Sequence, residues 1–196
     1  MDRDARNKFF ESVGDGVILN LGAGERTILT GTEWIGFDIQ PHANCEVVGD
    51  AHQLPFRDES FDAVHTVSVF EHLRKPWLAA AEIVRVLRPG GFLFCSVPFA
   101  YPIHGSPYDF FRYTPDGLLS IFEALEGEVF PARGPISSIG LYTERVADAV
   151  FPGKLGFAAR WCTAWAIQPL KYLDPWLTKS NPDSATSFTI LATKPI

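Results

Sequence analysis

The sequence predicts an α/β fold with a mainly parallel β-sheet. Short apolar runs rich in β-branched residues alternate with stretches of helical periodicity, which is the pattern of consecutive βαβ units. The chain has 196 residues, 46% of them hydrophobic, which is enough to bury one sizeable core. The expected strands lie at residues 17–21, 33–38, 45–49, 62–68, 91–97 and 187–194, with a weaker pattern at 128–132.

Helical periodicity is clearest over residues 77–87. The apolar positions that recur there at helical spacing are Leu78, Ala81, Val84 and Leu87. We expect residues 89–91, Pro-Gly-Gly, to end this helix and turn the chain into the next strand. Another helix should begin at Thr114, whose side chain suits the N-cap, with Pro115 in its first turn.

Two irregularities are expected in this plan. The connection between the first two strands, residues 22–34, is hardly longer than the dozen residues that a parallel crossover needs, so its helix should be short or absent. Residues 134–183 form a long insertion before the last strand, with helical patterns at 139–150 and 155–167. No linker divides the chain, so residues 1–196 are expected to form a single domain that carries this helical insertion.

Charge and cysteine usage limit the class of protein. The net charge of -6 argues against nonspecific binding of nucleic acid, which requires a cationic surface. The N-terminus is charged where a signal peptide would be apolar, and the one long uncharged run, residues 89–108, is interrupted by glycine and proline. Three widely spaced cysteines favour a reducing compartment over a disulfide framework, so we expect a cytoplasmic protein.

Chemically suitable residues follow the strands at their carboxyl ends, where open parallel sheets bind ligands. Gly22 and Gly24 permit a tight turn and the close approach of a ligand, although an ordinary turn also uses such glycines. Asp38 can accept hydrogen bonds from both hydroxyls of a ribose; a solvated strand-end carboxylate is the alternative. Asp50 could accept from an adenine amino group or close an Asx-turn.

Four further motifs join these residues in a fixed order: DAHQLPF (50–56), FDAV (61–64), EHL (71–73) and RVLRPGG (85–91). Together the segments resemble the class I S-adenosylmethionine-dependent methyltransferases, particularly the small-molecule branch similar to ubiquinone and menaquinone biosynthesis enzymes. The resemblance covers residues 17–99 and resumes in the last strand. It implies a Rossmann-like seven-stranded sheet with an antiparallel last strand.

The resemblance also implies S-adenosylmethionine as the cofactor. Its expected contacts are Asn20, Gly22, Gly24, Asp38, Ile39, Asp50, Ala51, Ser68, Val69 and Phe70. Two positions depart from the family pattern. Asn20 stands where an acid is usual, and Arg26 stands where a small residue is common. Weak cofactor binding or loss of activity would follow if Asn20 cannot replace the missing charge.

Two histidines are candidates for the general base that a hydroxyl acceptor would need, because a neutral imidazole has a suitable pKa. His72 belongs to the EHL motif and could act as the base or orient its loop. His104 lies in residues 98–115, a segment similar to the HGxPxDxxRYT loop of methyltransferase-like proteins associated with bacterial surface glycans and other glycosylated products.

Residues 98–115 are dense in aromatic and ionisable side chains, which suits a sugar with apolar faces and hydroxyl groups. We assign Asp109 to the catalytic set with the two histidines. The expected contacts of the acceptor are Tyr101, Tyr108, Arg112 and Tyr113. The alternative is a lid held by an Asp109–Arg112 pair. His65, inside a strand, is interpreted as a core residue, and the histidines and cysteines show no metal-ligand spacing, so no metal is expected.

The segment 151–178 combines tryptophans with basic residues. Most such apolar stripes are core or dimer contacts; the alternative is peripheral contact with a membrane or a lipid-linked glycan acceptor. The sequence therefore predicts methyl transfer to a small-molecule acceptor, with a saccharide hydroxyl as the leading candidate. A degenerate, non-catalytic cofactor-binding or scaffold protein is the first alternative, and a nicotinamide-dependent oxidoreductase the second.

Overall fold

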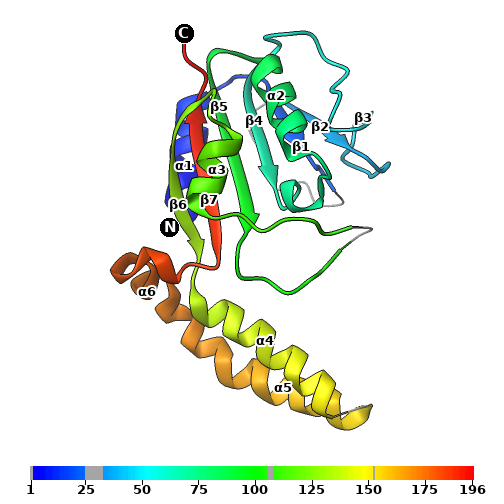
Figure 1. Ribbon diagram of the computed structural model, residues 1–196, viewed down its shortest axis with the longest axis vertical. Helices are drawn as coiled ribbons and strands as arrows, with labels where there is room; N and C mark the ends of the chain where they lie inside the picture. Colours follow the sequence, from blue (N-terminus) through cyan, green and yellow to red (C-terminus); the bar gives the residue numbers. More distant parts are fainter. Residues whose placement is uncertain (1, 25–32, 106–107, 152) are drawn as a thin grey trace.

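A computed structural model describes residues 2–24, 33–105, 108–151 and 153–196. It contains a seven-stranded sheet in the order β3-β2-β1-β4-β5-β7-β6 (Figure 1). The strands are β1 (Ile18–Leu21), β2 (Trp34–Asp38), β3 (Val47–Val48), β4 (Phe61–Val67), β5 (Leu87–Pro98), β6 (Glu126–Arg133) and β7 (Ser187–Thr193). The pairs among β1 to β5 are parallel, and β7 runs antiparallel to both β5 and β6. The expected fold class is confirmed.

Helices cover both faces of the sheet. Helix α1 (Asp2–Val13) lies on one face, where it contacts β5, β6 and β7, and helices α2 (Pro76–Val86) and α3 (Pro115–Ile121) lie on the other (Figure 1). Each face has its own apolar cluster, because the side chains of a strand alternate between the two faces. Ile18, Ala63 and Phe94 pack with α1, whereas Leu19, Leu21 and Val64 belong to the larger cluster with α2 and α3.

Helix α2 confirms the expected helix but corrects its orientation. Its buried residues include Ala79, Ala80 and Ile83, whereas Leu78, which the sequence pattern placed on the apolar face, is exposed. The helix ends at Val86, before the Pro-Gly-Gly turn, and β5 begins at Leu87. The turn instead forms an irregularity inside the strand, where the pairing with β4 shifts.

The remaining element boundaries agree with the sequence only in part. The Thr114 hydroxyl accepts a hydrogen bond from the Gly117 amide and so caps α3 as expected. The strand expected at 45–49 is shorter, Val47–Val48, and lies at the edge of the sheet. Helix α1 was not singled out by the sequence pattern. The expected short first crossover falls largely on residues 25–32, which lie outside the described residues.

The insertion is helical, as expected. It comprises α4 (Pro135–Val150), α5 (Lys154–Ile167), the 3-10 turn η2 (Gln168–Leu173), α6 (Asp174–Ser180) and the short turn η3 (Pro182–Ser184). Helices α4 and α5 form a hairpin that projects away from the sheet (Figure 1). Within the described part of the chain, no helix is long and apolar enough to span a lipid bilayer.

Candidate active site

The loop after β1 turns through two glycines in the left-handed region, Gly22 at φ 77° and Gly24 at φ 57°. The Gly22 amide donates to the Phe37 carbonyl oxygen at 2.8 Å, which ties the loop to β2. A Cβ atom at Gly22 would lie 2.1 Å from Val69 Cγ2, so the loops after β1 and β4 touch at this point. Among the described residues, which do not include 25–32, a Cβ atom at Gly24 would meet nothing within 4 Å.

Asp38 ends β2 beside this glycine loop. Its Oδ2 accepts a hydrogen bond from the Gly24 amide at 3.0 Å, and its Oδ1 accepts one from the Gln40 amide at 3.0 Å. A carboxylate has about four acceptor positions, so both oxygens can still accept from the hydroxyls of a ribose. The neighbouring Ile39 is 68% exposed. An exposed apolar side chain next to a carboxylate fits the base and ribose of an adenosine.

Asp50 follows the edge strand β3. Its Oδ1 accepts a hydrogen bond from the His52 amide at 2.9 Å and lies 2.5 Å from His52 Nδ1. The hydrogen bond from the His52 amide, followed by the His52 side chain, lowers the pKa of Asp50. The Asx-turn is therefore present, and the ionised carboxylate remains largely exposed, whereas Ala51 is buried beneath it.

The loop after β4 carries the three residues expected beside the sulfonium. Ser68 has φ 57°, an uncommon conformation for a residue with a side chain, and its amide donates to the Ser96 carbonyl oxygen at 2.9 Å. Val69 packs against Gly22, and Phe70 is buried. Ser68 and Val67 also line a cleft of about 340 Å³ at the carboxyl ends of β4 and β5.

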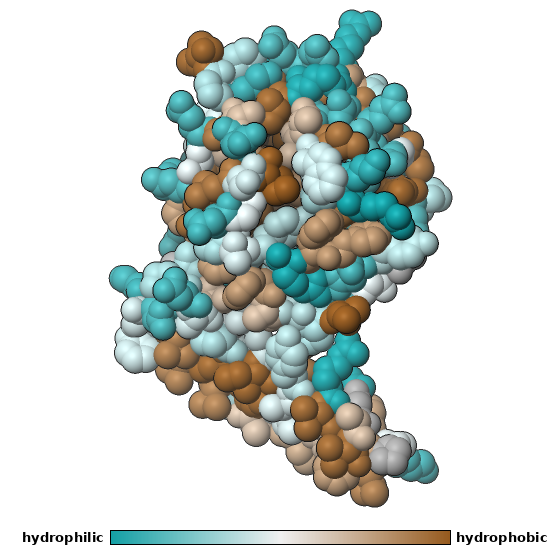
Figure 2. Space-filling view, in the orientation of Figure 1, coloured by the Kyte–Doolittle hydropathy of each residue, from teal (hydrophilic) through white to brown (hydrophobic). Residues whose placement is uncertain are grey.

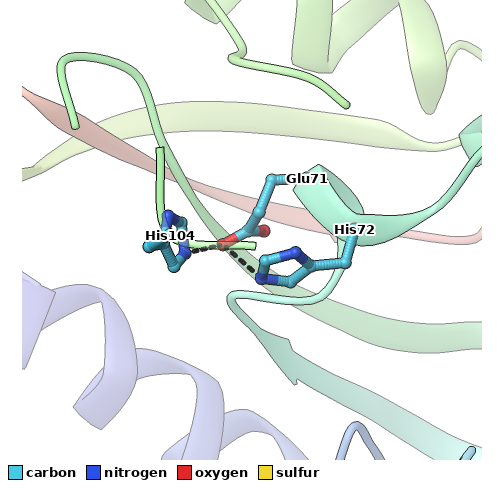
Figure 3. A group of neighbouring side chains, drawn as sticks. All are labelled: Glu71, His72 and His104. Carbon is cyan, nitrogen blue, oxygen red and sulfur yellow. Dashed lines mark ion pairs between the residues drawn. The ribbon is translucent and has the colours of Figure 1, made fainter. Parts of the chain in front are cut away.

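Glu71, His72 and His104 meet in this cleft (Figure 3). His72 Nε2 lies 3.8 Å from Glu71 Oε1, and His104 Nε2 lies 3.7 Å from the same oxygen. The Glu71 side chain has no exposed surface, and among the described residues neither of its oxygens has a hydrogen-bond partner. Burial raises the pKa of Glu71 to about 6. The structure thus brings together the two expected histidines around a carboxylate.

Sequence reasoning missed Glu71 as a site residue. It belongs to the EHL motif, and the only sign of its role was an acid directly before a candidate base, which is common on surfaces. The 3-10 turn η1 (Phe70–His72) turns the Glu71 side chain inward and leaves His72 at the cleft. The Glu71 carbonyl oxygen also accepts from the Phe110 amide at 2.7 Å, which ties this turn to residues 98–115, here called the acceptor loop.

Asp109 and Arg112 form a bidentate pair inside the acceptor loop. Arg112 also donates to the carbonyl oxygens of Tyr101 and Pro102, both at 3.2 Å. The hydrogen bonds from Arg112 hold the pKa of Asp109 well below its usual range. Asp109 Oδ2 accepts from the His104 amide at 3.0 Å and lies 3.3 Å from His104 Nδ1. These contacts are those of the alternative interpretation, in which the Asp109–Arg112 pair holds the loop.

The three expected tyrosines occupy different places. Tyr101 lines the cleft, with its ring centroid 4.8 Å from that of His104. Tyr108 is exposed, and its carbonyl oxygen lies 2.6 Å from His72 Nδ1. Tyr113 is buried, and its hydroxyl donates to the Phe70 carbonyl oxygen at 2.9 Å. Tyr113 thus lies away from the cleft surface, because its ring completes the core beneath the loop.

Asn20 does not lie with the other expected cofactor contacts. Its Oδ1 is 3.2 Å from His65 Nδ1, and His65 packs among Phe9, Phe10 and other rings on the α1 side of the sheet. Burial lowers the pKa of His65 to about 4, so this partly buried histidine is neutral and packs among core rings. Arg26, the other departure from the family pattern, lies outside the described residues.

The residues present fit S-adenosylmethionine at the β1, β2 and β3 ends. No described residue fills the position of a Cβ atom at Gly24, Asp38 retains acceptor capacity, and the exposed Ile39 offers an apolar contact to an adenine. The cleft with His72 and His104 lies beyond Ser68, where an acceptor could reach a methyl group held at the loop after β4.

Comparison with known proteins agrees with this arrangement. Residues 23–95 match a family model described as a methyltransferase domain. An uncharacterised methyltransferase of Mycobacterium marinum is 32% identical over 104 residues, which cover 44% of this chain and 40% of the relative. A demethylmenaquinone methyltransferase of Renibacterium salmoninarum is 42% identical over 59 residues, 30% of this chain and 24% of the relative. The chain thus spans less than half the length of either relative.

The fold is also similar to solved structures. Phosphoethanolamine N-methyltransferase 2 of Haemonchus contortus, in complex with phosphomonomethylethanolamine and S-adenosylhomocysteine, aligns with a TM-score of 0.61 at 16% identity. The alignment covers 100% of this chain and 52% of that one. The matched segment and the relatives support a class I S-adenosylmethionine-dependent methyltransferase, and the solved structure shows the same fold.

Proposed function

We propose that residues 1–196 form a single methyltransferase domain that transfers a methyl group from S-adenosylmethionine to a hydroxyl of a small-molecule acceptor. The observation that carries the proposal is the cleft after β4 and β5, in which two histidines stand next to the loops expected to hold the cofactor. Bound S-adenosylmethionine would supply an electrophilic methyl group on its sulfonium sulfur. The methyl group passes to the acceptor oxygen, and the acceptor loses its proton.

The residues at the β1 to β3 ends bind and orient the cofactor in this proposal. Asp38 accepts from the ribose hydroxyls, Asp50 faces the adenine, and Ser68 and Val69 border the methyl group. Because an in-line displacement depends on the alignment of its reactants, positioning supplies much of the catalysis.

The acceptor proton goes to His104 or His72. Acceptors of hydrogen bonds lie beside Nδ1 of both rings, which leaves Nε2 of each ring free to take a proton. Asp109 and Arg112 hold the loop that carries His104, and we assign them as positioning residues, because their contacts are with each other and with the loop. Tyr101 offers an aromatic face to the acceptor.

A saccharide hydroxyl is the acceptor that we favour. An aromatic wall from Tyr101 beside polar groups at His72 and His104 suits the mixed apolar and hydroxylated surface of a sugar. The acceptor would belong to a glycan or to a glycosylated product. The test is a screen of sugar acceptors with labelled methyl donor, with His104→Ala and His72→Ala variants compared separately.

The loss of a general base typically lowers the turnover number by roughly 10²–10⁴-fold. We expect one of the two variants to show this loss with little change in the KM for S-adenosylmethionine. Full turnover by His104→Ala on the true acceptor would remove His104 from the base role, and the same outcome for His72→Ala would remove His72.

The first alternative, a non-catalytic cofactor-binding or scaffold protein, rests on Asn20, which pairs with His65 instead of pointing to the glycine loop. Calorimetric titration with S-adenosylmethionine and S-adenosylhomocysteine separates it from an enzyme. We expect micromolar binding that Asp38→Ala abolishes, because that variant removes the ribose acceptor. The absence of binding to either ligand would favour the scaffold. Quenching of NADH fluorescence would instead support the oxidoreductase alternative.

The outer face of the α4–α5 hairpin is a second binding surface in this proposal. Phe157, Trp161 and Trp165 are all more than half exposed, so they lie outside the core of this chain. With Tyr172 and Glu144 they line a groove of about 630 Å³. The groove contacts either a membrane surface that presents a lipid-linked acceptor, or a second copy of the chain. A cytoplasmic location is part of the proposal, because all three cysteines, including the exposed Cys162, are free thiols.

A further inference from the structure

Three potential ligand atoms converge at one point of the cleft. Glu71 Oε1, one ring nitrogen of His72 and one of His104 lie within 4.8 Å of one another. The Glu71 carboxylate points between the two imidazole rings, and its Oε1 is the atom nearest to both Nε2 atoms (Figure 3). The side chain has no exposed surface and no hydrogen-bond partner among the described residues. A buried polar group is normally satisfied, so this carboxylate lacks a partner.

The surroundings of both rings determine which nitrogen carries the proton. His72 Nδ1 lies 2.6 Å from the Tyr108 carbonyl oxygen, which can only accept a hydrogen bond. His104 Nδ1 lies 3.2 Å from the Pro102 carbonyl oxygen and 3.3 Å from Asp109 Oδ2, which are also acceptors. The proton of each neutral ring therefore lies on Nδ1, and both Nε2 atoms present lone pairs to the Glu71 oxygen.

Three lone-pair donors that face each other repel unless a proton or a metal cation lies between them. We propose that Glu71, His72 and His104 bind a zinc ion. Two imidazole nitrogens and one carboxylate oxygen form the three-ligand set of catalytic zinc sites, which leave the fourth position open. Here the open position faces the cleft of about 340 Å³.

Two of the three separations between the ligand atoms are close to those of a zinc site, and the third, between the two imidazole nitrogens, lies within 4.8 Å. Tetrahedral zinc with ligands at about 2.0–2.2 Å separates its ligand atoms by roughly 3.4 Å. The two distances from Glu71 Oε1 to the imidazole nitrogens, 3.7 and 3.8 Å, are close to this value. The contacts to Tyr108, Pro102 and Asp109 are those that orient metal-ligating histidines, which donate from their other ring nitrogen to a carbonyl or carboxylate oxygen.

The inference goes beyond the proposed function and can be tested apart from it, since zinc binding can be measured without a methyl donor. Zinc lowers the pKa of a coordinated oxygen ligand. An acceptor hydroxyl at the open position would release its proton to solvent, and its oxygen would then attack the methyl carbon while the sulfonium sulfur takes the electrons of the broken carbon–sulfur bond. Zinc and a proton compete for Nε2, so His104 and His72 act as bases only in the metal-free protein.

The test is calorimetric titration of tag-free, chelator-treated protein with Zn²⁺, together with the visible absorption spectrum after Co²⁺ addition. We expect one zinc ion per chain and the spectrum of four-coordinate cobalt. Glu71→Gln keeps the volume of the buried side chain and removes its charge. Its zinc affinity should fall by more than about 100-fold, because losing a residue that only hydrogen-bonds to a metal ligand already lowers the affinity by roughly 10–100-fold. Asp109→Asn should show a fall within that smaller range.

Matched controls lie outside the cluster. His42→Asn and Glu123→Gln remove one imidazole and one carboxylate from other parts of the chain and should bind zinc as the parent does. If Glu71→Gln does not fold, the cobalt spectrum of the parent and the zinc affinity of Asp109→Asn decide whether these residues bind zinc. Absence of zinc binding by the parent, or unchanged affinity in Glu71→Gln, overturns the inference. If the protein binds no zinc but transfers methyl groups, the metal site is wrong and the proposed function stands. If it binds zinc but transfers no methyl group, the metal site stands and the proposed function is wrong.

Discussion

His65 lies in the central strand β4 and is enclosed by aromatic rings. Phe94 stacks on it at a centroid distance of 5.0 Å, and Trp34 meets it edge-on at 5.8 Å. Its Nδ1 lies beside Asn20 Oδ1. A neutral imidazole that donates to this amide oxygen is satisfied there, whereas an imidazolium would be buried with little solvation. The asparagine at the position where the family usually has an acid thus has a structural partner across the parallel β1–β4 pair.

This enclosure makes stability dependent on pH. Burial, and secondarily the charge of Arg6, lowers the pKa of His65 from 6.5 to about 4 in the folded chain. Because the folded-state pKa is depressed, the stability that the neutral ring contributes is present above pH 6.5 and is lost as the pH falls through about 4. The full effect is on the order of 3 kcal/mol.

We predict that His65→Gln, which can still donate to Asn20, weakens this dependence. Unfolding in urea at pH 7, 5.5 and 4 measures it. The parent should lose stability between pH 6.5 and 4 more steeply than the variant. An equal slope for both proteins would mean that His65 is not the group responsible.

At the scale of elements, a carboxylate joins two helices of the insertion, α4 and α6. Asp174, at the start of α6, accepts hydrogen bonds from the amides of Ile136 at 2.8 Å and Ser137 at 3.0 Å, the first turn of α4. It therefore caps a helix that begins nearly forty residues earlier in the chain, a spacing of 38 between Asp174 and Ile136. A Cβ atom at Gly134 would lie 2.4 Å from Asp174 Oδ1, so this glycine makes the approach possible.

We predict that Asp174→Ala loosens the base of the hairpin. Loss of an N-cap typically costs about 0.5–2 kcal/mol. Hydrogen exchange should accelerate at the first amides of α4, whereas the amides of β4 and β5 keep their protection. Acceleration spread evenly over the sheet would show that Asp174 supports the whole fold and not this junction.

At this scale, the sequence predicted those features that depend on residues close together in the chain. The Thr114 cap of α3 needs only residues a few positions apart, and it was predicted. The Asp174 cap joins elements distant in sequence, and no local pattern indicates it. The phase of α2 was wrong for the same reason, because which side of an alanine-rich helix is buried depends on the sheet beneath it.

At the scale of the whole molecule, apolar side chains gather on the hairpin at the opposite end from the chain's C-terminus (Figures 1 and 2). Contiguous exposed apolar surface of this kind normally marks an interaction site. Lys154 and Lys171 lie on the same segment, and basic residues beside tryptophans favour an anionic membrane surface, while a second copy would cover the apolar face equally well.

We predict that a Trp161→Ser, Trp165→Ser double variant loses this association. Co-sedimentation with anionic vesicles at low salt tests the membrane, and sedimentation velocity over a range of protein concentrations tests the dimer. Trp77→Ser is the matched control, because Trp77 is comparably exposed but lies on α2, outside the hairpin. A parent protein that neither binds vesicles nor dimerises would remove the proposed role of the surface.

The sequence alone determined the α/β class, the strand order along the chain and the resemblance to methyltransferases. These properties follow from periodicity and from motifs such as DAHQLPF and RVLRPGG, which are contiguous in the chain. It also identified Asp38, His72 and His104 as candidates, because strand ends are recognisable positions. Only the tertiary structure decided which side chains meet. Glu71 acquired its place between two histidines because η1 turns it inward while the acceptor loop returns His104 to the same point. Such convergence depends on contacts between residues 33 positions apart, and local periodicity carries no information about them.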